Sequence, residues 1–517
     1  MYDIVIKNGT VIDGLNHKAV QQDVGIVGDR IVAVGVLTDA ESVETIDASG
    51  CCVAPGLIDV HTHADGWLLQ SPHFAPRTVQ GITTEVLMAD GISYAPVSDE
   101  TTREWLFYLR SLDGLRFSDY TGWENIADYM SILDGHTAQN VMTHIPYANL
   151  RALALGWGRA APDDFQMQQL RAMAVQGMAE GAVGLSTGLD YISECYATTD
   201  ELVDACRAIS DFKGLYVTHI RYKIGLLQGL QEAVEISRRA NVPLHVSHLK
   251  SRIPGEIEAV IQYINDVAVN EVDFSFDLYP FASSSTMLNY LLPYEVWDDG
   301  PLGAVRQLTS RTIRTRFERS LTDEMLRIAH IAWLPSRDNA VHIGKSLRAY
   351  CDSVRKPVGD ALCDLLIEEN LAVLLVFRWT EDERIAPFLG HPRSMIASDG
   401  IYFPQGLVHP RVFCTPARTL TRCVNEWNLF SIEEAIYKQT GFPAQRFGIV
   451  NRGAVVEGYF ADIIVFNPNE MFENVTFTHP TNASIRIRHV LVNGVGIIRD
   501  GKPITDTYPG RFLRYRR

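Results

Sequence analysis

The amino-acid sequence predicts an α/β fold: a TIM-like (β/α)8 barrel with a small β-sandwich domain formed by the N- and C-terminal segments. Three observations predict it. Short strand-like runs separated by Gly, Asn and Asp turns occur at both ends of the chain. Between them, apolar strand-like runs alternate with amphipathic helical stretches, the pattern of βα units around a parallel sheet. The length of 517 residues also exceeds one compact core of ordinary size.

The two ends of the chain are expected to pair into one domain. Their strand-like runs lie at residues 3–49 and 452–503. We therefore place the small β domain at residues 1–55 and 446–517, and the barrel at residues 56–445.

The middle of the chain contains the candidate barrel strands. Eight runs over about 340 residues fit a barrel enlarged by insertions better than an open doubly wound sheet. These runs are residues 57–63, 83–88, 140–145, 183–187, 216–221, 244–249, 273–279 and 395–398. Helical spacing of apolar residues predicts helices at residues 163–181 and 226–240. About residues 291–371 we expect an insertion that folds over the barrel mouth, because this stretch is longer than one helix needs.

Composition and charge exclude several classes of function. The chain is 46% hydrophobic and 21% charged, an ordinary globular composition. Its net charge of -16 comes without a basic run, which argues against nucleic acid as a partner. No apolar run approaches the roughly 20 residues of a membrane helix and no secretory signal opens the sequence, so we expect no membrane partner and a cytoplasmic location. The eight cysteines lack paired spacings, which fits reduced thiols.

The most informative motif ends the first candidate barrel strand. Two histidines one residue apart on a strand, His61 and His63, point the same way and can bind one ion. His219 and His248 end the fifth and sixth strands, on the face where barrels build active sites. Any one of these histidines alone is equally well explained as a core residue whose ring nitrogens are hydrogen-bonded. Four at three strand ends predict a metal site, because imidazole is costly to bury without partners and is the commonest metal ligand. His245 should point to the other face from His248, so we expect it to be structural.

The eighth strand ends with a carboxylate, Asp399, followed by Gly400. A turn or helix-capping role is common for such an aspartate. A metal-bound water, however, needs a base to take up its proton and an acid to protonate a leaving nitrogen, and one carboxylate can do both. Asp399 is therefore the candidate catalytic residue.

Taken together, these residues resemble the amidohydrolase superfamily and, within it, the N-acyl-D-amino-acid deacylase (D-aminoacylase) family, over nearly the whole chain. The resemblance rests on residues 54–63 (APGLIDVHTH), 81–84 (GITT), 181–191 (GAVGLSTGLDY), 218–221 (THIR), 245–250 (HVSHLK), 277–280 (DLYP), 398–400 (SDG) and 452–462 (RGAVVEGYFAD). It implies an amide hydrolase with one or two zinc ions, or other divalent metals. His219 and His248 would hold the zinc, with a weaker position at His61 and His63 and a bridging ligand at the end of the second strand.

The sequence departs from this family at two places. Asp90 stands where similar deacylases have a metal-bridging cysteine, and we expect it, rather than the earlier Glu85, to reach the metal. A carboxylate is harder than a thiolate and binds zinc less tightly, which opens the choice among zinc, manganese and cobalt. The second departure is Tyr222-Lys223, where similar proteins carry an acidic residue soon after the arginine. If these positions face the pocket, substrate preference has changed.

The expected reaction is hydrolysis of the amide bond of an N-acyl-D-amino acid, or of a similar N-substituted amide, by metal-bound hydroxide with Asp399 as general base and acid. Lys250 lies two residues beyond His248 on the same strand face, where its ammonium could meet a substrate carboxylate. With the resemblance, Tyr191 and Tyr279 join it as substrate-binding residues. The expected partner is thus a small-molecule amide, and a homo-oligomer is possible.

Two alternatives remain open. A cyclic-amide hydrolase of the hydantoinase or dihydroorotase kind shares the barrel, the paired histidines and the final aspartate. That group usually bridges its metals with a carboxylated lysine, and no lysine ends the third or fourth candidate strand. A catalytically inactive amidohydrolase-fold scaffold is the other alternative. The intact histidines and Asp399 argue against a scaffold, and only Asp90 favours it.

Overall fold

The computed structural model describes residues 1–482 and 487–515, and its central strands form a ring. The strands are β6 (Leu57–Asp59), β7 (Thr62–His63), β8 (Ile82–Leu87), β9 (Asn140–Thr143), β10 (Ile145–Pro146), β11 (Gly184–Gly188), β12 (Leu215–His219), β13 (Leu244–Val246), β14 (Phe274–Leu278), β18 (Ser394–Ile396) and β19 (Gly400–Ile401). Every neighbouring pair is parallel: β6 pairs with β8 and β8 with β9, the order β10-β11-β12-β13-β14-β18 follows, and β19 pairs with β7.

Short breaks divide three of these strands without opening the ring. β6 continues into β7, β9 into β10 and β18 into β19, each after one to three residues. The ring therefore consists of eight parallel strands and closes where β19 meets β7. This confirms the predicted barrel, and each of the eight strand-like runs supplies one of its strands.

The barrel interior is filled from alternate positions of the strands, as a period of two requires. One buried apolar cluster contains Ile58, Val60, Val86, Met142, Val183, Leu215, Val217, Met395 and Ala397, with Phe447 and Ile449. Phe447 follows α19 (Gly441–Arg446) and also meets the rings of the buried His144 and His245. The interior is thus a packed core, and the space for chemistry lies at the strand ends.

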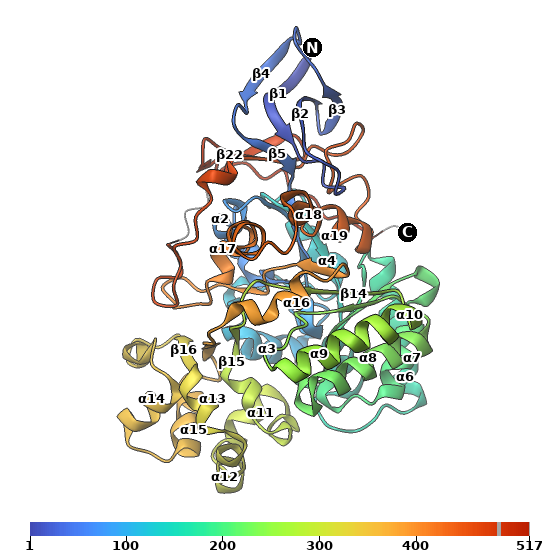
Figure 1. Cartoon of the computed structure of the whole chain (residues 1–517). Helices are drawn as coiled ribbons and strands as arrows, with labels where there is room; N and C mark the ends of the chain where they lie inside the picture. Colours follow the sequence, from blue (N-terminus) through green and yellow to red (C-terminus); the bar gives the residue numbers. More distant parts are fainter. Residues whose placement is uncertain (483–486, 516–517) are drawn as a thin grey trace.

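Helices surround the barrel and pack their apolar faces on it (Figure 1). They are α3 (Asp99–Tyr108), α4 (Ile126–Leu133), α5 (Tyr147–Leu155), α6 (Asp164–Ala179), α7 (Thr199–Arg207), α8 (Leu226–Ala240), α9 (Pro254–Tyr263), α16 (Ala386–Leu389), α17 (Arg411–Arg418) and α18 (Ile432–Tyr437). Both predicted helices are confirmed: Asp163 caps α6 in a capping box, and α8 ends in the left-handed Asn241 after two arginines. Among the described residues, no helix has the length and apolar character needed to span a bilayer.

The two ends of the chain pair in a nine-stranded sheet, which lies at the top of Figure 1. Its strands are β1 (Tyr2–Val11), β2 (Val20–Val27), β3 (Arg30–Gly35), β4 (Ser42–Asp47), β5 (Cys52–Pro55), β20 (Ile463–Phe466), β21 (Ile487–Val492), β22 (Val495–Arg499) and β23 (Lys502–Pro503). The N- and C-terminal parts meet where β5 pairs antiparallel with β20. The shared terminal β domain is confirmed, and its strands are connected as one sheet that forks at β1, which pairs with both β4 and β5.

A separate layer follows β14 and lies at the lower left of Figure 1. We call residues 284–377 the cap. It contains a three-stranded sheet, β15 (Ser284–Met287), β17 (Leu374–Phe377) and β16 (Ala329–Trp333), in the order β15-β17-β16. Its helices are α11 (Gly300–Gln307), α12 (Arg311–Ser320), α13 (Asp323–Ile328), α14 (Leu347–Val354) and α15 (Val358–Glu368).

Candidate metal centre and active site

The polar residues predicted from the sequence gather at the carboxyl ends of the barrel strands. His61 lies in the break between β6 and β7, His63 ends β7, and His219 ends β12. His248 follows β13 by two residues, and Asp399 lies in the break between β18 and β19. Asp90 belongs to a single 3-10 turn (Ala89–Gly91) just after β8. All are buried except His248, which is half-buried.

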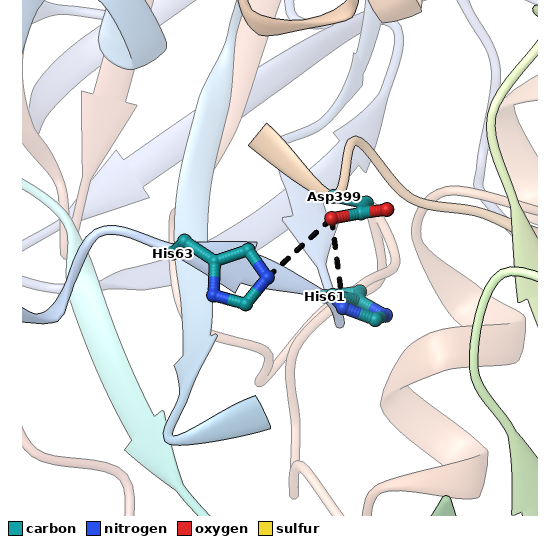
Figure 2. Close-up of side chains that lie close together, drawn as sticks. All are labelled: His61, His63 and Asp399. Carbon is teal, nitrogen blue, oxygen red and sulfur yellow. Dashed lines mark ion pairs between the residues drawn. The ribbon is translucent and has the colours of Figure 1, made fainter. Parts of the chain in front are cut away.

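One group forms around the paired histidines (Figure 2). Asp399 Oδ1 lies 3.4 Å from His63 Nε2 and 3.8 Å from His61 Nε2. The Asp90 carboxylate faces the same two nitrogens, at 3.6 Å from His61 and 3.7 Å from His63. Two histidines and two carboxylates therefore converge on one point.

A second group lies on the other side of Asp90. His219 Nδ1 and His248 Nε2 are 3.0 Å apart. Asp90 Oδ2 is 3.9 Å from His219 Nδ1, and Asp90 Oδ1 is 3.9 Å from His248 Nε2. The Asp90 carboxylate thus lies between the two pairs of histidines.

These donors fit zinc. Ligand atoms about 2.1 Å from a tetrahedral ion lie roughly 3.4 Å from one another, close to the distances found here. Among the described residues, His61 Nε2 and Asp90 Oδ1, which face the cluster, are buried and have no hydrogen-bond partner. Burial lowers the pKa of His61, but the carboxylates of Asp90, Asp277 and Asp399 outweigh it and raise that pKa well above its usual value. The cluster attracts positive charge, which a divalent cation supplies.

Buried aspartates lie behind the paired histidines. Asp277, at the end of β14, is 3.5 Å from His61 Nδ1 and also accepts a hydrogen bond from the His248 backbone N–H at 3.0 Å. Asp113 lies 3.9 Å from His63 Nδ1. Partners of this kind fix the orientation of a ligating imidazole and the nitrogen that carries its proton.

The other two histidines have outer partners of different chemistry. Asp190 Oδ2 is 3.7 Å from His219 Nε2, and the Tyr222 hydroxyl is 3.1 Å from His248 Nδ1. The Tyr222 hydroxyl donates to the Ser247 carbonyl, so it accepts from His248 Nδ1–H and leaves His248 Nε2 free to face Asp90. Tyr222, which departs from the sequence pattern of similar proteins, therefore contacts His248, a candidate metal ligand.

His245 and Glu85 point elsewhere. His245 Nε2 lies 3.0 Å from Asp277, behind the cluster. Glu85 accepts hydrogen bonds from Thr62 and Gln139. Neither side chain reaches the convergence of His61, Asp90 and His248.

Asp399 has a partner that the sequence interpretation missed. Arg411, at the start of α17, lies 2.8 Å from Asp399 Oδ2 and is fully buried. Burial raises the pKa of Asp399, but Arg411 and then His61 lower it to about 2. At neutral pH Asp399 is therefore a carboxylate that can accept a proton. Arg411 carried no sequence signal, because it follows an irregular stretch after the strand.

The three predicted substrate-binding residues line a cavity of about 330 Å³ that opens beside the cluster. Lys250 Nζ lies 3.6 Å from the centre of the Tyr279 ring, and the Arg411 guanidinium lies 4.2 Å from it. The Lys250 ammonium donates to the carbonyls of Phe281 and Ser283. The Tyr191 ring packs 4.9 Å from the ring of His219. The rest of the cavity wall combines apolar and hydroxyl-bearing side chains. The apolar ones are Leu112, Leu291, Met325, Phe377, Trp379 and Ile401, and the hydroxyl-bearing ones are Tyr222, Ser284, Ser285, Thr286 and Tyr290.

Comparisons with known proteins agree with this geometry. The model of the Amidohydrolase family (Amidohydro_3) matches residues 44–287 and 370–498. A D-aminoacylase from Alcaligenes xylosoxydans xylosoxydans is 33% identical over 99% of this chain and 97% of its own length. The crystal structure of an N-acyl-D-glutamate deacylase from Bordetella bronchiseptica, complexed with zinc and a phosphonate mimic of the tetrahedral intermediate, matches with a TM-score of 0.84. It is 28% identical, and the match covers 99% of both chains. A D-aminoacylase structure concerned with a binuclear metal centre matches with a TM-score of 0.83 at 29% identity over 99% of this chain and all of that one.

The barrel, the clustered histidines and these matches define a metal-dependent hydrolase, and the chain belongs to the amidohydrolase family. Within that family it groups with the N-acyl-D-amino-acid deacylases, as the sequence motifs predicted. It is accordingly a hydrolase of carbon–nitrogen bonds other than peptide bonds.

Proposed function

We propose that this protein hydrolyses the amide bond of N-acyl-D-amino acids to a carboxylic acid and a free D-amino acid. The observation that supports this most directly is the carboxylate of Asp399 beside the histidine cluster, with the basic Lys250 on the wall of the same cavity. The deacylase relatives act on substrates of this class, and we extend that activity to this chain.

The metal ligands in this proposal are His61, His63, His219 and His248, with Asp90 shared between the two groups. When bound there, zinc supplies a Lewis acid and lowers the pKa of water toward neutrality. Asp90 Oδ1 faces His61 and His248, and Oδ2 faces His63 and His219, so this carboxylate would be shared by both pairs of histidines. A hard carboxylate ligand would admit manganese or cobalt besides zinc.

Asp399 moves the proton in this reaction. Its carboxylate accepts a proton from the attacking water and returns it to the departing amine nitrogen, so one residue acts as base and then as acid. Arg411 holds Oδ2 and leaves Oδ1 directed at the histidines. The proton therefore transfers at Oδ1.

In this proposal the carboxylate of the substrate binds Lys250. Lys250 and Arg411 share the ring of Tyr279, and Asp399 is the acidic group between them and the histidines. An incoming carboxylate would form a charge-assisted hydrogen bond with Lys250, which lines the cavity, while the fully buried Arg411 stays paired with Asp399. Tyr279 and Tyr191 supply further hydroxyl donors beside the scissile amide.

The side chain of the substrate is neutral and apolar in this proposal. Besides the hydroxyl residues Ser284, Ser285 and Thr286, the cavity wall contains the apolar side chains Leu112, Leu291, Met325, Phe377 and Trp379. An acidic side chain placed against these apolar side chains would lose hydration without gaining a cation as partner. We therefore expect a preference for substrates such as N-acetyl-D-leucine over N-acetyl-D-glutamate.

The test is a hydrolysis screen of paired N-acetyl-D- and N-acetyl-L-amino acids, with hydantoin and dihydrouracil included, on protein whose metal content has been measured. Bound zinc together with D-selective turnover is the expected result. Turnover of the cyclic amides alone would move the assignment to a hydantoinase-type activity. No turnover of any substrate by metal-loaded protein would favour a scaffold.

Three predictions about the whole protein stay predictions. They are the division at residues 55 and 445, the cytoplasmic location and a homo-oligomer. Light scattering coupled to gel filtration measures the oligomeric state directly.

A further inference from the structure

The cap reaches the outer side of one histidine of the cluster, His219, through a single aspartate, Asp190. Tyr294 donates its hydroxyl to Asp190 Oδ1 at 2.7 Å, and Tyr290 donates to Asp190 Oδ2 at 3.1 Å. Both tyrosines lie in short 3-10 turns (Leu288–Leu291 and Tyr294–Trp297) at the start of the cap. Asp190 is buried and lies 3.7 Å from the outer nitrogen of His219. The hydroxyls thus reach His219 through a single carboxylate.

Lys223 connects these two tyrosines to the barrel. Its ammonium donates to the Tyr290 carbonyl at 2.9 Å and lies 4.6 Å and 4.4 Å from the ring centres of Tyr290 and Tyr294. The Lys223 backbone N–H also donates to Asp190 Oδ2 at 3.2 Å. An acidic side chain at position 223 would remove both cation–π contacts and place a second negative charge near Asp190. Lys223, which also departs from the sequence pattern of similar proteins, therefore stabilises the contact between the cap and the barrel.

The other histidines of the cluster are oriented without the cap. Asp277 faces His61, Asp113 faces His63 and Tyr222 faces His248, and these three partners lie outside residues 284–377. His219 is the histidine whose outer carboxylate receives hydrogen bonds from cap residues. The cap can therefore influence this metal position selectively.

We propose that Tyr290 and Tyr294 are positioning residues of the metal centre, which hold Asp190 against the outer nitrogen of His219 so that the cap sets the strength of metal binding. Asp190 can rotate its carboxylate about the side-chain bond, and two hydroxyl donors together with the Lys223 N–H restrict that rotation. A fixed carboxylate keeps the proton of His219 on Nε2 and its lone pair on Nδ1, directed toward Asp90 and His248. The inference rests on the proposed metal site but not on the identity of the substrate.

The experiment measures zinc affinity of the full chain by competition with a chromogenic chelator, in the absence of substrate. The Tyr290→Phe/Tyr294→Phe double variant is expected to bind zinc about 10-fold more weakly than the wild type, and Asp190→Asn by about 10- to 100-fold. Because both act through one path, the variant with all three substitutions should bind no more weakly than Asp190→Asn alone. At saturating zinc the double tyrosine variant should recover most of its kcat, since neither hydroxyl touches the reacting atoms.

Tyr350→Phe is the matched control, since Tyr350 is a buried tyrosine of the cap in α14, away from Asp190. It should bind zinc as the wild type does. Wild-type zinc affinity in a folded Tyr290→Phe/Tyr294→Phe protein, or fully additive losses in the triple variant, would overturn the proposal. If the double variant does not fold, Tyr294→Phe and Lys223→Met, each made alone, test the same contact between the cap and Asp190. Because zinc affinity is measured without substrate, this experiment tests the role of the two tyrosines even if the protein shows no deacylase activity.

Discussion

Three residues of the cluster have left-handed backbones: Asp90 with φ 56°, His248 with φ 37° and Asp399 with φ 47°. This conformation is unfavourable for residues with a Cβ, by about 1 to 3 kcal/mol each, and persists where the surroundings hold it. Asp399 has this conformation in the break between β18 and β19, and the turn directs its carboxylate toward His61 and His63. Aspartate and asparagine tolerate the left-handed region best among such residues, which guides the choice of substitutions.

Asp399→Asn should preserve the fold and the bound metal, because asparagine keeps the shape and tolerates the same backbone. It cannot accept the proton of the attacking water. We expect kcat to fall by a factor on the order of a hundred or more, with little change in metal content. Steady-state kinetics and elemental analysis on the same preparation check this. Retention of more than a tenth of the wild-type kcat would remove Asp399 from the proton transfer.

Asp90→Cys should change which metal is preferred. A thiolate is a softer ligand than a carboxylate and favours zinc over manganese. Placed between His61 and His248, it should raise the ratio of zinc to manganese affinity by about 10-fold or more, although the left-handed backbone suits cysteine less well. Competition titrations with both metals measure the ratio. Asp90→Asn, which keeps the backbone but loses the charge, should weaken both metals together; an unchanged ratio in Asp90→Cys would contradict a ligand role.

At the scale of secondary-structure elements, the barrel was predictable because its signals are local. Buried parallel strands are short apolar runs, and their carboxyl ends share one face, so His61, His219 and Asp399 could be grouped before any contact was known. The terminal β domain was predictable for the same reason. The breaks within three strands were not, because each falls where the strand changes from one neighbouring strand to the other, which depends on the assembled ring.

The outer partners of the cluster lay beyond prediction. Asp190 and Asp277 belong to segments recognised in the sequence, yet their roles follow from contacts with His219 and His61 across the barrel. Arg411 and Tyr294 lie on elements whose place over the cavity only the tertiary structure defines. Side chains that act through distant neighbours leave no periodic signal.

The cap supplies part of the cavity wall, so a single substitution in it should alter side-chain preference. Met325, on α13, lines the cavity and is only partly buried. Met325→Arg places a cation in place of an apolar side chain of the wall and should raise kcat/KM for N-acetyl-D-glutamate relative to N-acetyl-D-leucine by about 10-fold, the equivalent of roughly 1.4 kcal/mol. Met325→Leu is the control for lost volume and should leave the ratio near the wild-type value. An unchanged ratio in Met325→Arg would place the substrate side chain elsewhere in the cavity.

At the scale of the whole molecule, the cluster ties distant parts of the ring together. Its ligand-type residues come from the first, second, fifth, sixth and eighth barrel strands. A cation held by them contacts segments separated by more than 300 residues of sequence, from His61 to Asp399. An ion that binds the native state and not the unfolded chain stabilises the fold by mass action.

Removal of the metal should therefore lower the thermal stability of the entire barrel. With free zinc at 100 to 1,000 times the dissociation constant, the stabilisation is about 2.7 to 4.1 kcal/mol, which for a chain of this size corresponds to a Tm lower by about 2 to 4 °C after chelation. Calorimetric scans of chelated protein before and after zinc is restored measure the shift. The His61→Ala/Asp90→Ala variant, which lacks ligands from both groups, should shift by less than about 1 °C, whereas His330→Ala, in the cap strand β16, should keep the full shift. Equal Tm values for chelated and zinc-restored wild type would mean that the ion does not bind these strands together, because tight binding to the native state alone must raise Tm.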